Sequence, residues 1–428
     1  MHLNNIYIAN FKFLFMADVL FISSVVLSIL VFIFILFLFI VVIISMFKRE
    51  NFENFQPKVS VIIPAYNESK TIGLCLNSVL NQDYNNEVEI IVVDDGSSDN
   101  TLKILKKYKK VKVVKQKHLG KSKALNNGIS KAKNDFILVI DADTIIKKDF
   151  IREIIKPFSD KKVGATTGII KLKNNKGILP MFQNVEYSFY NLIRHSFSSL
   201  FKNSVWFLGA LACYRKDAIK KVGLFKTDSL TEDIDLAMEI NKAGYENISV
   251  GNAYGFTHVP ANLKSLYKQR SRWWIGALQA LFKNKKMFSF GYGVSILFLF
   301  INQIFWSIYS VIYPFLLAYQ YNYWLSYNIY SVYAFLVYTI RWFSFWGPLY
   351  VVYNLPKAGF SPFTFFGVLS GIMVTIMLLI ALKIFDYKFN FKNLTAIFFF
   401  FPYTIVLNII ILLSLVNINM WKRKDFKR

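Results

Sequence analysis

Cysteine and histidine are scarce in this sequence. The chain of 428 residues has two cysteines, Cys75 and Cys213, and four scattered histidines. Two cysteines support neither a disulfide framework nor a structural zinc site. The scattered positions of the histidines likewise give no reason to expect a histidine-based metal site.

Acidic residues are also few relative to basic ones. Asp and Glu together number 26 against 51 Lys and Arg, which gives a formal net charge of +25. A surface of this charge attracts anionic lipid headgroups and anionic small substrates. Nucleic acid is a weaker candidate partner, because the sequence contains no RNA- or DNA-binding motif.

Apolar residues, in contrast, make up 54% of the chain and aromatic residues 18%, more than an ordinary soluble protein carries. The run from Phe21 to Met46 contains no charge and is long enough to cross a hydrocarbon core of about 30 Å as a helix. Lys48, Arg49 and Glu50 follow it in place of a small-residue cleavage site. The run therefore predicts an uncleaved transmembrane helix rather than a signal peptide.

The C-terminal third returns to the same apolar composition, in four runs near 292–319, 326–352, 363–384 and 393–416. Residues 50–285 lie between the two apolar regions and hold most of the charge. They alternate β-branched apolar runs with Lys-rich helical stretches, which is typical of an α/β domain. The sequence thus predicts one soluble domain inserted between membrane segments.

Basic residues predict the orientation of these segments. The central domain and the tail WKRKDFKR are rich in Lys and Arg, and positive flanks stay on the cytoplasmic side of a membrane. One N-terminal crossing and four later ones leave both on that side. The predicted organisation of this multi-pass plasma membrane protein comprises an N-terminal segment with a transmembrane helix (1–47), a cytosolic domain (48–262), an amphipathic interfacial helix (263–290), four transmembrane helices (291–418) and a basic cytosolic tail (419–428).

Polar or acidic residues follow three predicted strands of the central domain, the first of which we expect Pro64 to end. The three are Val59–Ile63, Glu89–Val93 before Asp94-Asp95-Gly96, and Phe136–Ile140 before Asp141-Ala142-Asp143. In an open parallel sheet, ligands bind outside the carboxyl ends of the strands. A plain Asp-Gly turn is the simpler explanation of a single such motif. Two acid-ended strands on one sheet favour a site in which Asp141 and Asp143 direct oxygen ligands toward Mg²⁺ or Mn²⁺ and substrate phosphates.

The segment Gly120-Lys121-Ser122 invites comparison with a phosphate-binding loop. That interpretation fails, because Lys115 stands where the Walker loop needs its first glycine. Two alternatives remain. The segment is either an exposed, Lys-rich start of a helix or a basic loop that faces a nucleotide diphosphate.

Two helix-forming segments carry further charged residues. Thr231 is a predicted N-cap, with Glu232 and Asp233 in the first turn, where the helix dipole favours negative charge. The stretch QRSRWW, residues 269–274, stands where the chain returns to the membrane, and Trp and Arg are common at membrane interfaces without any chemical role. An apolar stripe at helical spacing accompanies it, formed by Leu263, Leu266, Tyr267, Trp274, Leu278 and Leu281.

Taken in order, PAYNES, DDGSSD, GKSKALNNG, DAD, TED and QRSRW resemble the motifs of family-2 glycosyltransferases, over roughly residues 58–285. The resemblance is to the membrane-embedded group that includes cellulose, chitin, hyaluronan and poly-N-acetylglucosamine synthases. GKSKALNNGI and LYKQRSRWWIG are most similar to bacterial poly-β-1,6-N-acetylglucosamine synthases. This implies an α/β glycosyltransferase-A-type domain, with a mostly parallel central sheet and helices on both faces, inserted between transmembrane helices.

The resemblance also implies a role for each matching position. Those of the donor site are contacts to uridine (Ala65, Tyr66, Glu68, Asp95), a lysine near the nucleotide (Lys121), ligands of diphosphate and metal (Asp141, Asp143) and an arginine that faces the diphosphate (Arg272). Those of the acceptor site are a catalytic base (Asp233) and residues beside the acceptor (Glu232, Gln269, Trp273). The segment FTHVPAN departs from the family, because many members have a glutamate near this proline where the chain has His258 and Ala261; no role is assigned to His258.

One base and one metal suffice for an inverting transfer from a nucleotide sugar. We therefore expect an inverting, metal-dependent transferase with a β-linked product, and the resemblance implies that it adds N-acetylglucosamine from a UDP-sugar to a growing polysaccharide. Two alternatives stay open: transfer of a single sugar to a polyprenyl phosphate or diacylglycerol, and a non-enzymatic transporter or scaffold. Five spans are few for a channel made by one chain, which favours a small accessory membrane protein or a homo-oligomer. Arg341, inside a predicted span, marks either a functional site or a side chain that snorkels to the interface.

Overall fold

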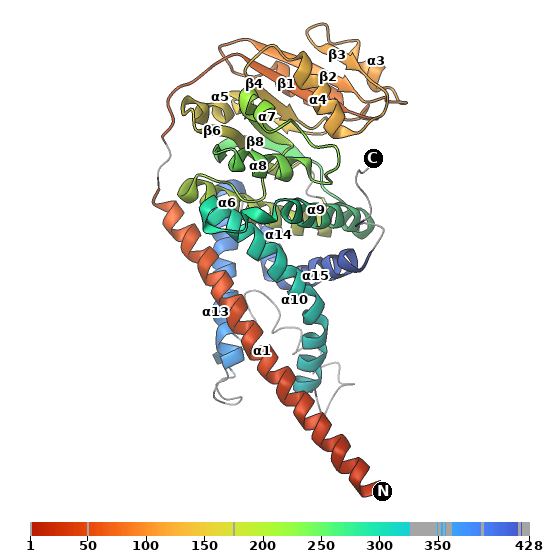
Figure 1. Cartoon of the computed structure of the whole chain (residues 1–428), viewed down its shortest axis with the longest axis vertical. Coiled ribbons are helices and arrows are strands. Elements are labelled where there is room, and N and C mark those ends of the chain that lie inside the picture. Colours follow the sequence, from red (N-terminus) through yellow and green to blue (C-terminus); the bar gives the residue numbers. More distant parts are fainter. Residues whose placement is uncertain are drawn as a thin grey trace.

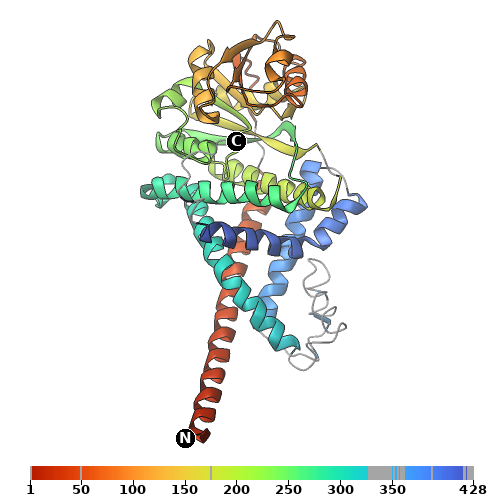
Figure 2. The same ribbon diagram turned by 90° about the vertical axis from the view of Figure 1, so that its right-hand side faces the viewer.

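The computed structural model describes residues 2–48, 51–173, 176–325, 349, 352–353, 356, 362–386, 389–417 and 421. Figure 1 shows the α/β domain at one end of the molecule and a set of long helices extending from it. Between these two parts lie helices that run across the long axis of the molecule, as the perpendicular view in Figure 2 also shows.

The α/β domain contains one eight-stranded sheet with the strand order β3-β2-β1-β4-β7-β6-β8-β5. The first four strands in this order are parallel, β7 is antiparallel to both of its neighbours, β6 and β8 are parallel, and β5 is antiparallel to β8. The strands are β1 (Val59–Ala65), β2 (Val88–Asp94), β3 (Lys112–Lys115), β4 (Phe136–Ile140), β5 (Ile145–Ile146), β6 (Val163–Leu172), β7 (Leu211–Arg215) and β8 (Glu246–Thr257). The predicted mostly parallel α/β fold is confirmed.

Apolar residues on both faces of the central strands bury the sheet. Every residue of β4 is buried, and along β1 Val61 and Ile63 belong to one apolar cluster while Ile62 belongs to another on the opposite face. This period of two follows from the pleat of a strand, and continuous apolar runs are typical of strands covered on both faces. The helical elements of the domain are α2 (Ile72–Leu80), α3 (Thr101–Leu105), α4 (Lys121–Lys131), α5 (Phe150–Ile155), the 3₁₀ turn Lys156–Ser159, α7 (Lys216–Lys221) and α8 (Glu232–Lys242).

Pro64 does not end β1, in contrast to the prediction, because the strand continues through Ala65. Pairing of β1 with β4 ends at Ile62, whereas pairing with β2 extends to Ala65. The proline therefore costs the sheet no hydrogen bond to β4, since the ladder on that side has already ended.

Three described helical segments are long and apolar enough to cross a membrane: Phe21–Met46 in α1 (His2–Met46), Val294–Phe315 in α10 (Val294–Leu325) and Phe365–Asp386. The last of these comprises most of α13 (Pro362–Ala381) and the π-helical turn Leu382–Asp386. A fourth candidate is the pair α14 (Phe391–Phe398) and α15 (Phe400–Val416), which meet at 60°. Most of the predicted span 326–352, including Arg341, lies outside the described residues.

Two long helices separate the α/β domain from these segments: α6 (Ile178–Phe201) and α9 (Leu263–Lys283) (Figure 1). The N-cap of α9 is Asn262, whose side chain accepts a hydrogen bond from the Ser265 backbone N–H at 3.0 Å. After α9 the chain makes two 3₁₀ turns, Lys285–Met287 and Phe290–Tyr292, before α10 begins. The QRSRWW stretch thus lies on a helix at the junction of the two parts.

Candidate active site

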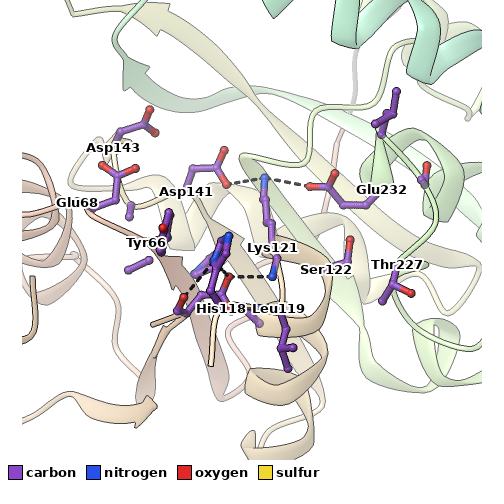
Figure 3. A pocket seen from close by; sticks show the side chains of 18 of the residues that line it. Tyr66, Glu68, His118, Leu119, Lys121, Ser122, Asp141, Asp143, Thr227 and Glu232 are labelled. Atoms are coloured by element: carbon purple, nitrogen blue, oxygen red, sulfur yellow. Dashed lines mark hydrogen bonds and ion pairs between the residues drawn. The ribbon is translucent and has the colours of Figure 1, made fainter. Parts of the chain in front are cut away.

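A pocket opens at the carboxyl ends of β1, β2 and β4, and several predicted site residues line it (Figure 3). Predicted residues in its lining are Ala65, Tyr66, Glu68, Asp95, Lys121, Asp141, Asp143, Glu232 and Arg272. Asp233, Gln269 and Trp273 are not among the lining residues. Parallel strands bring their carboxyl ends to one edge of a sheet, and residues from all six motifs line the pocket there.

Asp95 organises the loop that leads into α4. Its carboxylate accepts hydrogen bonds from the backbone N–H groups of Leu119 and Gly120, both at 2.9 Å, and from Gln116 Nε2 at 2.6 Å. Gly96 follows with φ 78°, and a Cβ at this position would lie 2.8 Å from the backbone nitrogen of His118. The glycine is therefore required both by its left-handed backbone and by the close approach of this loop.

His118 is a pocket residue that the sequence did not single out. Its ring stacks on Tyr66 with 4.0 Å between centroids and 21° between planes, and its Nδ1 lies 2.9 Å from the Asp95 carboxylate. The two rings form a flat aromatic surface at the end of β1. The sequence could not predict this position for His118, because the histidine lies outside the motifs and its partner Tyr66 is distant in sequence.

Lys121 joins three elements at the centre of the pocket. Its Nζ lies 2.7 Å from Asp141 Oδ1 and 3.1 Å from Glu232 Oε1 (Figure 3). Burial raises the pKa of the Glu232 carboxyl, but the positive charges of Lys121 and Arg272 outweigh it, so the pKa lies below its usual value. Lys121 thus places a positive charge in the pocket rather than on an exposed helix start.

The DAD motif contributes two carboxylates that line the pocket, Asp141 and Asp143. Cys75 donates from Sγ to the Asp141 carbonyl oxygen at 3.6 Å, and its pKa is raised by burial and then by the charges of Asp143 and Asp141. In the part of the chain that the structure describes, no three His, Cys, Asp or Glu side chains are grouped as a metal site. Two carboxylates fit Mg²⁺ or Mn²⁺ only if the remaining ligands come from substrate phosphates and water, which is the usual arrangement for Mg²⁺.

Asp233 lies in the first turn of α8, beside Glu232. Its Oδ2 accepts a hydrogen bond from the Gly209 backbone N–H and its Oδ1 accepts one from Ile234, both at 2.9 Å. Burial, followed by the charge of Glu232, raises the pKa of Asp233 above its usual value. A Cβ on Gly209 would lie 2.5 Å from the Asp233 Cβ, so the loop before β7 fixes this carboxylate by close packing.

The predicted Q-x-x-R-W box divides between two surroundings on α9. Arg272 lines the pocket and donates from Nη1 to the Leu230 carbonyl oxygen at 3.3 Å. Trp273 instead packs beside Tyr187 of α6, with 6.4 Å between ring centroids, and the Arg270 guanidinium lies 4.4 Å from its ring centre. Gln269 accepts a hydrogen bond from Arg270 Nη1 at 3.1 Å.

A mostly parallel sheet whose strand ends carry acidic residues, among them a DxD motif, is typical of a glycosyltransferase-A-type domain. Residues 60–223 match the model of glycosyl transferase family 2. The poly-β-1,6-N-acetyl-D-glucosamine synthase of Staphylococcus epidermidis is 36% identical over 232 residues, and that of Staphylococcus aureus strain COL is 35% identical over the same length. Both alignments cover 53% of this chain and 56% of the relative.

The mannosyltransferase PcManGT from Pyrobaculum calidifontis, solved with GDP-Man and Mn²⁺, has a similar fold. Its TM-score is 0.57 at 19% sequence identity, and the match covers 87% of this chain and 99% of that one. The chain spans about half the length of the curated synthases it matches. The resemblance inferred from the motifs is confirmed: residues 60–223 form a family-2 glycosyltransferase domain, and the chain is similar to those synthases over about half of its length.

Proposed function

We propose that this protein is an inverting, metal-dependent membrane glycosyltransferase that adds N-acetylglucosamine from a UDP-sugar to a growing β-linked polysaccharide. The observation that carries the proposal is the pocket itself, where aromatic, acidic and basic residues of six family motifs converge and where Glu232, the chain neighbour of Asp233, lines the wall. The names of the similar synthases support this polymer and this sugar.

The donor end of the proposed site runs from the Tyr66–His118 ring pair to Lys121. A uracil ring fits a flat aromatic surface, and the diphosphate carries negative charge toward Lys121 and Arg272. The charge of Lys121 is balanced by Asp141 and Glu232. A bound diphosphate thus competes for a cation that two carboxylates already hold.

Asp141 and Asp143 are the residues that would hold the divalent cation. When bound, Mg²⁺ or Mn²⁺ neutralises charge that develops on the leaving diphosphate. The similar mannosyltransferase was solved in complex with Mn²⁺, which is consistent with a divalent cation in this fold.

Asp233 is proposed as the general base. The acceptor hydroxyl gives its proton to the Asp233 carboxylate, its oxygen forms a bond to the anomeric carbon, and the bond from that carbon to the diphosphate breaks, releasing UDP. Attack from the face opposite the leaving group inverts the anomeric centre, and one carboxylate is enough. The raised pKa of Asp233 brings it closer to the operating pH, where proton transfer is most effective.

The membrane arrangement proposed here keeps the predicted division of the chain. The α/β domain lies in the cytoplasm, and α9 lies at the interface so that a sugar accepted by the domain is next to the bilayer. Helices α1, α10 and α13 provide membrane spans, and an accessory protein or a second copy of the chain contributes to the path of export.

The base is tested by Asp233→Asn, measured as transfer of radiolabelled sugar and as UDP binding. The amide keeps the size of the side chain but cannot take the proton, so turnover should fall by about 10² to 10⁴ while UDP affinity stays near the native value. Asp217→Asn is the matched control, because Asp217 is also in the first turn of a helix of this domain but is exposed. Loss of UDP binding in Asp233→Asn would contradict the assignment and make this aspartate a donor-binding or structural residue.

A further inference from the structure

Glu186 is a buried carboxylate at the junction of the α/β domain and the membrane helices. It lies on α6 with 2% of its surface exposed. Its Oε2 lies 2.9 Å from Arg270 Nη2 on α9 and accepts a hydrogen bond from the Tyr403 hydroxyl on α15 at 2.6 Å. Three helices that are distant in sequence thus meet at one oxygen atom.

A contribution to the stability of the fold does not by itself explain the buried contacts among Glu186, Arg270 and Tyr403. Removing two charges from water costs several kcal/mol per ion, and a buried ion pair recovers that cost only when its remaining donors and acceptors are bonded. Within the described residues, Glu186 Oε1 and Arg270 Nε are buried without a hydrogen-bond partner. A well-packed apolar group would suit a purely structural contact better, which points to a role in fixing a geometry.

The ion pair of Glu186 and Arg270 fixes the position of the Trp273 ring. Burial lowers the pKa of Arg270, but Glu186 and Tyr187 outweigh that effect and keep the guanidinium charged. This guanidinium lies over the Trp273 ring, 4.4 Å from its centre, and over the Tyr187 ring at 5.5 Å. A planar cation held over an aromatic face restricts the ring in tilt and position.

We infer that Glu186 and Tyr403 are positioning residues for the acceptor end of the site: through Arg270 they hold the Trp273 ring in place, so that α15 sets how the acceptor sugar is received. The inference rests on the proposed function and on the place beside the acceptor that the family resemblance implies for Trp273. It adds a link from that ring, through Glu186, to Tyr403 on α15 in the apolar C-terminal part of the chain.

Tyr403→Phe is the least invasive test, because it removes one hydroxyl group and keeps the ring that stacks on Phe182. Ser414→Ala is the matched control: it removes another hydroxyl from α15, one whose hydrogen bonds go to Ser271 of α9, at 2.6 Å, and to the Ile410 carbonyl oxygen rather than to Glu186. Both variants are prepared as the full chain in proteoliposomes. The donor is UDP-N-acetylglucosamine and the acceptor probe is a short β-linked N-acetylglucosamine oligosaccharide.

For Tyr403→Phe we expect the apparent KM for the acceptor probe to rise by about 10-fold, the usual effect of losing one hydrogen bond to a charged group. The KM for the donor should stay within about twofold of the native value, and Ser414→Ala should behave as the native protein for both substrates. A merely structural contact would change both KM values together or neither. Equal KM values for native protein and Tyr403→Phe would overturn the inference.

A double-variant cycle tests the route through Trp273 and covers the case in which Tyr403→Phe does not fold. Glu186→Gln keeps the size of the side chain and removes its charge. If Glu186 acts through Trp273, then Glu186→Gln with Trp273→Phe should have the same acceptor KM as Trp273→Phe alone. Additive effects would overturn the inference. Native protein that does not extend the acceptor probe would instead refute the proposed function, and the two failures are thereby distinguished.

Discussion

At the scale of single residues, the start of α8 is the most informative part of the site. Glu232 and Asp233 are adjacent carboxylates whose pKa values move in opposite directions, downward for Glu232 beside Lys121 and Arg272 and upward for Asp233. Groups whose surroundings separate their pKa values in this way are typical of acid–base assignments in enzymes. The lowered pKa of Glu232 suits an ion-pair partner of Lys121, and the raised pKa of Asp233 suits a residue that takes up a proton.

The pH dependence of turnover follows from this difference. Asp233 acts as a base only when deprotonated, so kcat should fall as the pH is lowered through its raised pKa. After burial, the charge of Glu232 is the largest cause of that rise, and Glu232→Gln should therefore move the acid limb of the profile to lower pH. Glu239→Gln, on the same helix and beside Lys242, should leave the limb in place. An acid limb that moves upward or stays fixed in Glu232→Gln would contradict the assignment of Asp233.

At the scale of helices and strands, many of the residues that line the pocket could be predicted from the sequence. Strand ends and helix starts are local features of a sequence. A short stretch of residues is enough to show an apolar run, the acidic residues after it or the N-cap of α8. The Glu186 group could not be predicted in this way, because Arg270 and Tyr403 lie 84 and 217 residues further along the chain. Which polar residue on α6 faces which helix depends on packing that no local pattern contains.

The crossing of α8 and α9 gives a test at this scale. A Cβ on Gly276 would lie 2.5 Å from Thr231 Cγ2 and 2.9 Å from its Oγ1, at the N-cap of the helix that carries Glu232 and Asp233. Gly276→Ala should force the two helices apart, lower the free energy of unfolding by about 1–3 kcal/mol and reduce kcat. Calorimetry and a transfer assay measure the two effects.

Gly73→Ala on α2 is the control for this substitution, because the nearest atom to its Cβ would be Tyr108 Oη at an ordinary 3.4 Å. It should leave both stability and turnover near their native values. Native behaviour of Gly276→Ala would show that the contact between α8 and α9 does not set the position of the acidic residues.

At the scale of the whole molecule, composition predicted the division into an α/β domain and apolar helices, and the structure adds where they join. One apolar run, 393–416, forms two helices that meet at 60° between Phe398 and Phe400. Pro402 in the first turn of α15 is a local signal for such a break, because the N–H that proline lacks has no helical partner in a first turn, whereas in a helix interior its loss costs a hydrogen bond. Helix α15 runs across the long axis of the molecule, next to α9 (Figure 2), and this direction brings Tyr403 to Glu186. The predicted straight span over 393–416 did not include such a contact.

The central claim, synthesis of a β-linked polymer, is tested most directly by the product itself. The purified full chain in proteoliposomes is supplied with Mg²⁺ and radiolabelled UDP-N-acetylglucosamine, and the products are measured by mass spectrometry. We expect a ladder of β-linked N-acetylglucosamine chains, shortened or lost in Trp273→Ala, because an aromatic face that stacks on a sugar ring favours holding the chain between additions. A lipid that carries one sugar as the sole product, whatever the donor, would contradict the claim and establish transfer to a lipid acceptor.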